Sequence, residues 1–566
     1  MEYKSETKTC QNCKKDFIIE PDDFSFYEKV KVPAPTFCSE CRFQKRIMFR
    51  NEIVFYKRQC DLCRKNIISI FSPEKEYKVF CSKCWWGDNW NPGEYYLDYS
   101  PQKTFFEQFK ELQSKTPFME KVVDYPTLTN CEYVNHSGNS KNCYLMFNAD
   151  FCENVFYSST LDHVKDSADC LMMNKTELSY ECIGGDGSGV YFSENCPESI
   201  NVWYSKDCVA CHDCFGCVNL RHKSYYIFNK SYSKEEYQKK IKEMKLDKYS
   251  SHLKIQEKIY GFWNKFPRRY MYGRMNKNSS GDYVYNSKNA KNCYQAVHVE
   301  DGAYSQLITI PTFKDSFDIT EFGMGVEHSI DSVTVGYGVY GVKYCSVLFT
   351  NARDVEYSMY GGSLKNCFGC LNIRNKEFCI LNKQYSREEY EKLKNHIIKD
   401  MKENPYIDKL GRVWRYGDFF PYDLSPFAYN ESFANLYFPL NKEKIEKQGF
   451  GYFESQKTNY QKTMELNDVP DSIKDIQDDF VEQVMQCGCG KFYRIAKGEL
   501  LLLKRFVLPI PRSCPDCRYM KRIKRLNPPR LYNRKCDKCG IEIKTPYAPN
   551  RPEIVYCEKC YQQEVY

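Results

Sequence analysis

The sequence predicts a mainly β protein, with two tandem β-solenoid-like lobes in the middle of the chain and small α+β zinc modules at both ends. Three observations support this fold class. Cysteines near both termini occur in close pairs, the two termini are copies of one another, and the middle is a second duplication rich in short strands. An antiparallel β-sandwich is the alternative fold for the two middle lobes.

The composition is that of a folded protein with several domains. Of the 566 residues, 42% are hydrophobic and 28% are charged, which excludes wholesale disorder. Because the chain has no run of about 18 apolar residues and no apolar segment at its start, we expect neither a membrane span nor classical secretion. The 31 cysteines, beside only 8 histidines, indicate thiolate metal sites in a reducing compartment, and the cytoplasm is the expected location.

Six segments are expected from these patterns. They are a double zinc module (1–98), a linker (99–126), a first β-rich lobe with a capping helix (127–262), a second such lobe (263–404), a proline- and aromatic-rich linker (405–480) and a second double zinc module (481–566).

The terminal modules are related by a constant offset of 476 residues. Cys13 corresponds to Cys489, Cys38 to Cys514, and the match continues to Cys84 and Cys560. The first ligand departs from this rule, because the position that corresponds to Cys10 is Gln486 and the cysteine has moved to Cys487. The C-terminal module therefore begins with Cys-x-Cys instead of Cys-x-x-Cys.

Each module has the cysteine spacing of two tetrahedral Cys₄ zinc sites, so we expect about four zinc ions in the whole chain. The simplest grouping is sequential, and a cross-braced grouping also fits the spacing. Iron in the same ligands is an alternative metal, and unligated buried cysteines are the alternative to a metal. The predicted ligands are Cys10, Cys13, Cys38, Cys41, Cys60, Cys63, Cys81, Cys84, Cys487, Cys489, Cys514, Cys517, Cys536, Cys539, Cys557 and Cys560.

The terminal motifs carry a family resemblance. The stretches Cys10-Gln-Asn-Cys13 and Cys38-Ser-Glu-Cys41-Arg42, with Cys514-Pro-Asp-Cys517-Arg518, resemble the probable zinc-ribbon or treble-clef family of bacterial proteins. The resemblance covers about 180 residues and implies a zinc knuckle, a β-hairpin and a short helix whose first turn donates the last two ligands. It implies zinc binding without a substrate or reaction. The whole arrangement also resembles large uncharacterised zinc proteins of candidate-phyla bacteria, which imply no function.

The middle lobes repeat one another most clearly at their ends. The segment that begins Cys214-Phe-Gly-Cys217 matches the one that begins Cys367-Phe-Gly-Cys370. Each is followed by a capping box, at Ser233 and Ser386, which predicts charged helices near residues 233–262 and 386–404. We interpret these helices as solvated caps over the ends of the solenoids.

One run of four cysteines in the first lobe has a second interpretation. Cys208, Cys211, Cys214 and Cys217 have spacing similar to an iron–sulfur motif, which would indicate a redox protein. The second lobe keeps only the counterparts of the last two. We therefore favour small inward-facing core residues.

The distribution of charge suggests a nucleic-acid-binding protein. Residues 481–566 contain 18 Lys and Arg against 8 Asp and Glu, whereas residues 1–98 contain 17 against 15. The basic residues follow the second cysteine pair of the C-terminal module, where they could contact phosphates of RNA or a single strand. The candidate contact residues are Arg518, Tyr519, Lys521, Arg522, Lys524, Arg525, Arg530, Tyr532 and Arg534.

Two function classes follow from these observations. The first is a zinc-binding, non-catalytic protein that contacts nucleic acid. The alternative is a protein–protein interaction scaffold with purely structural zinc, and an iron–sulfur redox protein ranks third. No catalytic motif is present in the sequence and no small-molecule substrate is indicated, so we expect no enzyme.

Overall fold

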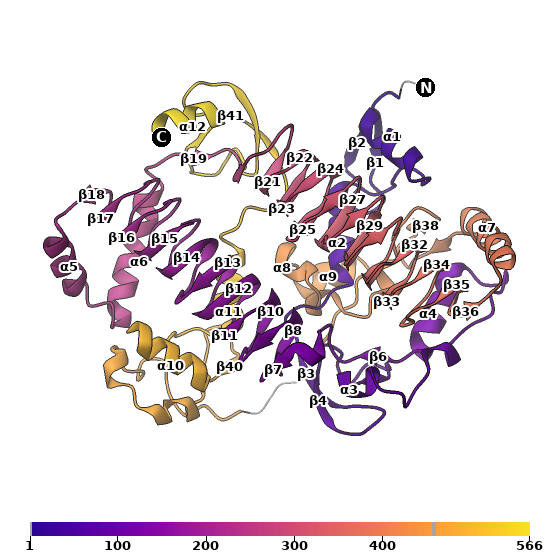
Figure 1. Cartoon of the computed structure of the whole chain (residues 1–566), viewed down its shortest axis with the longest axis horizontal. Helices are drawn as coiled ribbons and strands as arrows, with labels where there is room; N and C mark the ends of the chain where they lie inside the picture. Colours follow the sequence, from indigo (N-terminus) through magenta and orange to yellow (C-terminus); the bar gives the residue numbers. More distant parts are fainter. Residues whose placement is uncertain (1–2, 455–459, 566) are drawn as a thin grey trace.

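The computed structural model describes residues 3–454 and 460–565 and contains two β-solenoids that lie side by side, with segments from both termini packed around them (Figure 1). The first solenoid is a 12-stranded sheet and the second a 17-stranded sheet. Successive strands pair in parallel, except for the hairpin that ends each solenoid. The mainly β, solenoid prediction is confirmed, and the antiparallel sandwich is wrong.

The strands of both solenoids are short. Those of the first are β7 (Leu128–Thr129), β8 (Val134–Gly138), β9 (Ser140–Lys141), β10 (Met146–Asp150), β11 (Glu153–Phe156), β12 (Ser159–Ala168), β13 (Leu171–Glu177), β14 (Ile183–Tyr191), β15 (Ser199–Trp203), β16 (His212–Phe215), β17 (Ser224–Ile227) and β18 (Lys230–Ser231). Those of the second are β20 (Gly273–Arg274), β21 (Gly281–Tyr285), β22 (Lys288–Lys291), β23 (Cys293–Val297), β24 (Val299–Ala303), β25 (Gln306–Ile308), β26 (Phe313–Lys314), β27 (Phe317–Phe322), β28 (Val326–Glu327), β29 (Ile330–Gly336), β30 (Val339–Tyr340), β31 (Ser346–Phe349), β32 (Arg353–Glu356), β33 (Met359–Gly362), β34 (Lys365–Phe368), β35 (Glu377–Ile380) and β36 (Lys383–Gln384).

The coils owe their shape to a left-handed backbone bend at every third residue. In the first solenoid Ser159 pairs with Leu171, so one coil takes 12 residues. In the middle of the second, Val333 pairs with Ser346, which makes a coil of 13. The bends include Asn139, Asn142 and Asn148, and Asn and Asp tolerate this conformation better than most residues do.

The residue after each bend points into the coil. Ser140, Cys143 and Met146 follow the bends at 139, 142 and 145, and all three are buried. An interior serine accepts the backbone N–H of the next coil, as the Ser140 hydroxyl does from Cys152 at 3.1 Å. Small polar or sulfur-containing side chains thus fill a narrow interior and satisfy its backbone groups.

The four-cysteine run of the first solenoid lies in this interior. Cys208, Cys211, Cys214 and Cys217 are all at most 1% exposed. Each thiol donates to the carbonyl two residues earlier, at 3.4 to 3.6 Å. They are not among the cysteine sets that converge on one point within the described residues. This placement is the one that the core interpretation expects.

Helices close both solenoids. The predicted capping boxes are present at Ser233, which starts α5 (Lys234–Glu243), and at Ser386, which starts α7 (Arg387–Glu403). The helix expected near 233–262 is broken into α5 and α6 (Tyr249–Trp263), because Lys245 takes a left-handed conformation and Lys248 bridges to Ser472. In residues 3–454 and 460–565, no helix has the length and apolar character needed to cross a membrane.

The two terminal modules have the same order of elements. The N-terminal module contains β1 (Glu6–Thr9), β2 (Asp16–Ile19), α1 (Pro21–Lys29), α2 (Ser39–Met48), β3 (Tyr56–Gln59), β4 (Asn66–Ser69), β5 (Val79–Phe80) and α3 (Ser82–Trp85). The C-terminal module contains β39 (Met485–Gln486), β40 (Phe492–Tyr493), α10 (Lys497–Phe506), α11 (Pro515–Ile523), β41 (Tyr532–Lys535), β42 (Glu542–Thr545), β43 (Val555–Tyr556) and α12 (Glu558–Val565).

The segments between these units also pack tightly. Residues 99–126 contain α4 (Phe105–Lys115), β6 (Phe118–Met119) and η2 (Tyr125–Thr127), after η1 (Pro92–Glu94), and β19 (Arg268–Arg269) precedes the second solenoid. Residues 405–480 form β37 (Tyr406–Ile407), β38 (Val413–Trp414), η3 (Tyr422–Leu424), η4 (Tyr429–Glu431), α8 (Ala434–Tyr437), α9 (Lys442–Lys447), η5 (Ile473–Asp475) and part of η6 (Asp478–Glu482). The aromatic part of this segment packs on the N-terminal module, where the Trp414 ring stacks on Phe37.

Candidate metal centres and the clasps they hold

Sixteen cysteines converge in four groups of four sulfur atoms. The groups are Cys10, Cys13, Cys38 and Cys41; Cys60, Cys63, Cys81 and Cys84; Cys487, Cys489, Cys514 and Cys517; and Cys536, Cys539, Cys557 and Cys560. Within each group all sulfur atoms lie within 4.8 Å of one another. The structure therefore brings together all sixteen predicted ligands in the sequential grouping, and the cross-braced grouping is wrong.

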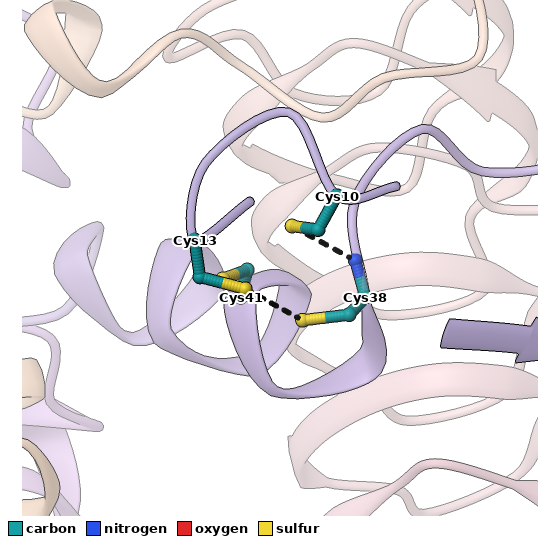
Figure 2. Close-up of side chains that lie close together, drawn as sticks. All are labelled: Cys10, Cys13, Cys38 and Cys41. Atoms are coloured by element: carbon teal, nitrogen blue, oxygen red, sulfur yellow. Dashed lines mark hydrogen bonds between the residues drawn. The ribbon is translucent and has the colours of Figure 1, made fainter. Parts of the chain in front are cut away.

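Local structure positions each group in the same way. In the first, Cys10 and Cys13 lie in the turn between β1 and β2, while Cys38 is the N-cap of α2 and Cys41 lies in its first turn (Figure 2). Cys514 begins α11 in the same manner. This arrangement of hairpin and helix is compatible with the zinc-ribbon-like modules that the resemblance implies.

The distances between sulfur atoms fit a tetrahedral metal ion. The Cys13 and Cys38 sulfurs are 3.8 Å apart, and the corresponding distance between Cys489 and Cys514 is 3.7 Å. A tetrahedron with a metal–sulfur bond of about 2.3 Å has edges of roughly 3.8 Å. The Cys-x-Cys turn, with Gly490 in a left-handed conformation, thus still delivers both of its sulfurs to the group.

Backbone amides donate to some of these sulfurs and favour their thiolate form. The Cys38 N–H donates to the Cys10 sulfur at 3.3 Å, and the Cys81 N–H donates to Cys60 at 3.2 Å. A backbone N–H, that of Lys65, is the main cause that lowers the pKa of Cys63 to about 7. Four thiolates around one ion leave no open coordination position, so each group is a closed, structural type of site.

The helix that starts at each first metal site inserts cations into a solenoid. On α2, Arg42 pairs with Asp318 at 2.9 Å, and Arg46 pairs with both Asp318 at 3.0 Å and Asp331 at 2.9 Å. The Arg46 side chain is fully buried. These acids stand at the left-handed bends of the second solenoid, and side chains there point out of the coil.

The C-terminal module makes the same contact with the first solenoid. Arg518 and Arg522 of α11 both pair with Asp169, at 2.5 and 2.6 Å. The match extends to the backbone, because Arg522 donates to the Tyr157 carbonyl as Arg46 does to that of Tyr304. Each module thus docks on the solenoid that is farther from it in sequence order, in one pseudo-symmetric geometry.

The second metal site of each module lies where the two solenoids meet. Strand β5 pairs in parallel with β6, which enters the first solenoid, while the Trp85 carbonyl accepts a hydrogen bond from Arg374 at the end of the second. Correspondingly, β43 pairs with β19, which enters the second solenoid, and the Tyr561 hydroxyl donates to Asn219 at the end of the first. The chain therefore forms a closed arrangement in which both modules bridge both solenoids.

The predicted nucleic-acid face of α11 is not available. Arg518, Tyr519 and Arg522 are 7%, 4% and 0% exposed, because they face the first solenoid. Among the others, Lys521 pairs with Glu181, Arg525 with Glu194, Arg530 with Glu40 and Arg534 with Asp537, while Tyr532 is half-buried and Lys524 is exposed. The prediction that this helix presents a phosphate-contacting surface is therefore wrong for its buried residues.

Sequence reasoning missed the acidic columns that receive these cations. Asp169 and Glu181 are 12 residues apart and Asp318 and Asp331 are 13 apart, and each stands at a left-handed bend. Acids at the coil spacing were the available signal. A further group, Asp315, Glu327 and His328, could approach a metal, but the Lys29 ammonium lies 2.8 Å from Asp315 and supplies a cation.

Two small hollows border the interfaces. One, of about 10 Å³, is lined by residues that include Phe43 and Asn527. Another, of about 20 Å³, includes Phe147 and Tyr519. Each has room for about one water molecule.

Comparisons with known proteins assign no family. No protein-family model matches the chain, and no curated protein matches it. Among solved structures, the chain matches a putative acetyltransferase from Desulfovibrio desulfuricans G20, with 10% sequence identity over 50% of this chain and 84% of that chain. The TM-score is 0.10, so this similarity supports no statement about fold or function.

Proposed function

We propose that the chain is a zinc-dependent, non-catalytic binding protein with four structural zinc ions. These ions would stabilise the two terminal modules (1–98 and 481–566), which we call the clasps because they join the pair of β-solenoids. The observation that carries this proposal is the coupling between the first metal group of each module and a buried ion-pair cluster. Cys41 and Arg42 are neighbours on α2, and Cys517 and Arg518 are neighbours on α11. Metal ligation therefore fixes the helix that inserts the guanidinium groups.

Zinc is the metal that this ligand set favours. Closed sets of four thiolates with tetrahedral spacing are typical of structural zinc, whereas a catalytic zinc keeps a position open for water or substrate. Iron in a rubredoxin-like site has the same ligands and would make the protein a redox carrier. Elemental analysis separates the two, with about four zinc ions per chain expected.

The metal would be needed because the ion pairs alone contribute too little net free energy to hold the modules on the solenoids. Burying an arginine is costly unless its partner is held in place, and the gain from a buried pair often only offsets the desolvation of both groups. Ligation free energies of roughly 10 kcal/mol or more per zinc are available to order small modules. Zinc would thus supply the energy that keeps the cations in register with the acidic columns.

A test removes the metal and measures the shape of the protein. Chelation should expand the molecule in small-angle X-ray scattering, because the clasps would release the solenoids. The β signal in circular dichroism should largely remain, since the solenoid ladders contain no metal ligand. A protein that stays compact without metal, or one purified with iron or without any metal, would contradict the proposal.

The scaffold interpretation fits this arrangement better than binding through α11. The modules direct their basic side chains inward at Arg46 and Arg522, so their role would be to join the solenoids. Surfaces outside the clasps would then make the contacts with partners.

A further inference from the structure

The end of the first solenoid carries a concentration of exposed lysines, which we call the basic cap. It comprises the last coil, α5 and α6, within residues 221–265, and α5 lies at the outer end of that solenoid (Figure 1). Its exposed lysines are Lys223, Lys230, Lys234, Lys239, Lys240, Lys242, Lys245, Lys254, Lys258 and Lys265. Residues 221–265 contain 12 Lys and Arg against 5 Asp and Glu.

The exposed lysines of the basic cap form no ion pairs within the described residues, whereas some lysines of the equivalent cap do. None of the ten forms an ion pair with any residue that the structure describes, although Glu235 and Glu243 lie on the same helix. In the equivalent cap, Lys394 pairs with Glu356 at 2.9 Å and Lys399 with Glu403 at 3.9 Å.

The balance of charge differs in the same direction. Residues 221–251 contain 9 Lys and Arg against 4 Asp and Glu, whereas the equivalent residues 374–404 contain 8 against 6. A solvated cap needs no such excess, because the second solenoid is closed without it.

One aromatic ring, that of Tyr232, lies among the lysines of the basic cap, and a second ring is exposed on α6. The Lys230 and Lys240 ammonium groups lie 5.7 and 5.1 Å from the centre of the Tyr232 ring. On α6, the Tyr260 side chain is 41% exposed. Exposed lysines together with accessible rings are typical of surfaces that bind single strands, where ammonium groups contact phosphates and bases stack on the rings.

We propose that the basic cap binds single-stranded nucleic acid. Lysines supply non-directional charge that suits a phosphate backbone without reading its sequence. A single strand is favoured over a duplex because its bases are free to stack on Tyr232 and Tyr260. This inference goes beyond the proposed clasp function, since no residue of the basic cap belongs to a metal group.

A membrane surface fits these residues less well. An interfacial helix needs an apolar face that inserts between lipids. The apolar side chains of α5 face the protein, where Tyr237 is buried and Ile241 and Met244 pack against the core. The charged side of the helix is therefore left without an inserting face.

The test measures binding of a fluorescein-labelled oligothymidylate of about 20 nucleotides to the full chain by fluorescence anisotropy. This length exceeds the roughly 4–16 nucleotides that a single-strand-binding domain covers. The affinity should fall as the salt concentration rises. In a plot of the logarithm of the binding constant against the logarithm of the salt concentration, each phosphate contact should steepen the slope by about 0.7. Absence of binding at low salt would overturn the proposal.

A matched pair of variants locates the surface. The quadruple change Lys234→Gln, Lys239→Gln, Lys240→Gln and Lys242→Gln should weaken binding at least about tenfold and lower the salt slope. The control Arg387→Gln, Lys392→Gln, Lys399→Gln and Lys402→Gln removes as many exposed charges from α7 and should change affinity less than about twofold. Equal effects of the two variants would overturn the assignment to the basic cap.

Two further measurements keep the result specific. Tyr260→Ala should weaken binding several-fold without changing the salt slope, because it removes stacking and leaves the charges. Zinc content and circular dichroism should match the wild type in all variants. If polyglutamate or anionic phospholipid vesicles compete as well as the oligonucleotide does, the cap binds polyanions in general and the proposal fails. Should the quadruple variant not fold, the double variant Lys239→Gln and Lys242→Gln gives the same test. Its salt dependence of binding should then be reduced by a smaller amount.

Discussion

The two terminal modules differ in formal charge but make the same contact. Counted by itself, the C-terminal module is strongly basic and the N-terminal module nearly neutral. In the structure Arg46 and Arg522 occupy equivalent positions, and each is fully buried against a carboxylate of a solenoid. The comparison teaches that the charge of a module has little meaning apart from the surface that neutralises it.

The difference between the modules lies in how the cations share their acids. Arg46 has two carboxylate partners, Asp318 and Asp331, whereas Arg522 has only Asp169 among the described residues. Each solenoid also has a further pair: Arg525 with Glu194 in the first, where the N-terminal module has Phe49, and Arg50 with Glu321 in the second. The two clasps should therefore respond equally to loss of metal and unequally to loss of single acids.

The largest effect should come from removing a metal ligand. We expect Cys41→Ser and Cys517→Ser each to lower the zinc content from about four to about three and to unfold the affected module, because roughly 10 kcal/mol of ligation energy is at stake per site. Elemental analysis and limited proteolysis check this result.

An interior cysteine provides the control for these variants. Cys152→Ser should keep all the zinc and cost little stability, because serines such as Ser140 already occupy equivalent inward positions. If either terminal variant retained full zinc content, the equivalence of the two modules would be lost.

The next largest effect should come from the shared acids. Asp169→Asn leaves Arg522 buried without a carboxylate, and we expect a loss of about 3–5 kcal/mol in the free energy of unfolding. Asp331→Asn should cost less, because Asp318 remains 3.0 Å from Arg46 and still pairs with Arg42. Urea denaturation of both variants measures the difference.

An exposed acid of the same solenoid is the control for that comparison. Asp162 is exposed, and Asp162→Asn should change the free energy of unfolding by less than about 0.5 kcal/mol. Equal losses for Asp169→Asn and Asp331→Asn would show that the sharing of acids does not matter.

Much of the fold could be predicted because its signals are local or periodic. Strand patterns, capping boxes at Ser233 and Ser386, and cysteine spacing each depend on residues close in sequence. The sixteen cysteines could be identified from the spacing and from the offset between the termini, whereas the choice of the sequential over the cross-braced grouping needed the structure. The break between α5 and α6 was missed, because it depends on a contact with Ser472 far along the chain.

The docking of the modules could not be predicted in the same way. Arg46 and Asp318 are separated by 272 residues, and no local pattern joins them. The charge count treated α11 as an isolated surface, although the acids that neutralise it lie in the first solenoid. The 12- and 13-residue spacing of acids was visible, but it acquires meaning only when the coil length is known.

A smaller effect on the free energy of unfolding should appear at acidic pH. It concerns Glu194, which belongs to the first solenoid. Burial by itself would raise the pKa of Glu194, but Lys206 and Arg525 lower it to about 2. A carboxyl whose pKa is lowered in the folded protein stabilises the fold at any pH above its pKa in the unfolded chain, which is about 4.5. This contribution is lost as the pH falls toward the folded pKa of about 2. Wild type should therefore lose on the order of 2–3 kcal/mol more than Glu194→Gln between about pH 6 and pH 3. Urea midpoints at the two pH values check the difference, and parallel losses would contradict the pairing with Arg525.

The smallest effect should be a difference in the rate of zinc release between the first metal site of the N-terminal module and the first metal site of the C-terminal module. The Cys-x-Cys turn of Cys487 and Cys489 has one residue fewer to aim its sulfurs than the Cys-x-x-Cys turn of Cys10 and Cys13. Exposure does not distinguish the two sites, because Cys13 and Cys489 are both exposed. We expect the C-terminal first site to lose zinc to a chromogenic chelator first, roughly tenfold faster than its N-terminal counterpart, which corresponds to about 1.4 kcal/mol in the barrier. The double change Gln486→Cys and Cys487→Gln restores the longer spacing and should slow this phase toward the N-terminal rate. If the first zinc instead leaves from a site that Cys41→Ser abolishes, the shorter turn is not the weaker one, and the difference between the modules must lie in the ion pairs of α2 and α11.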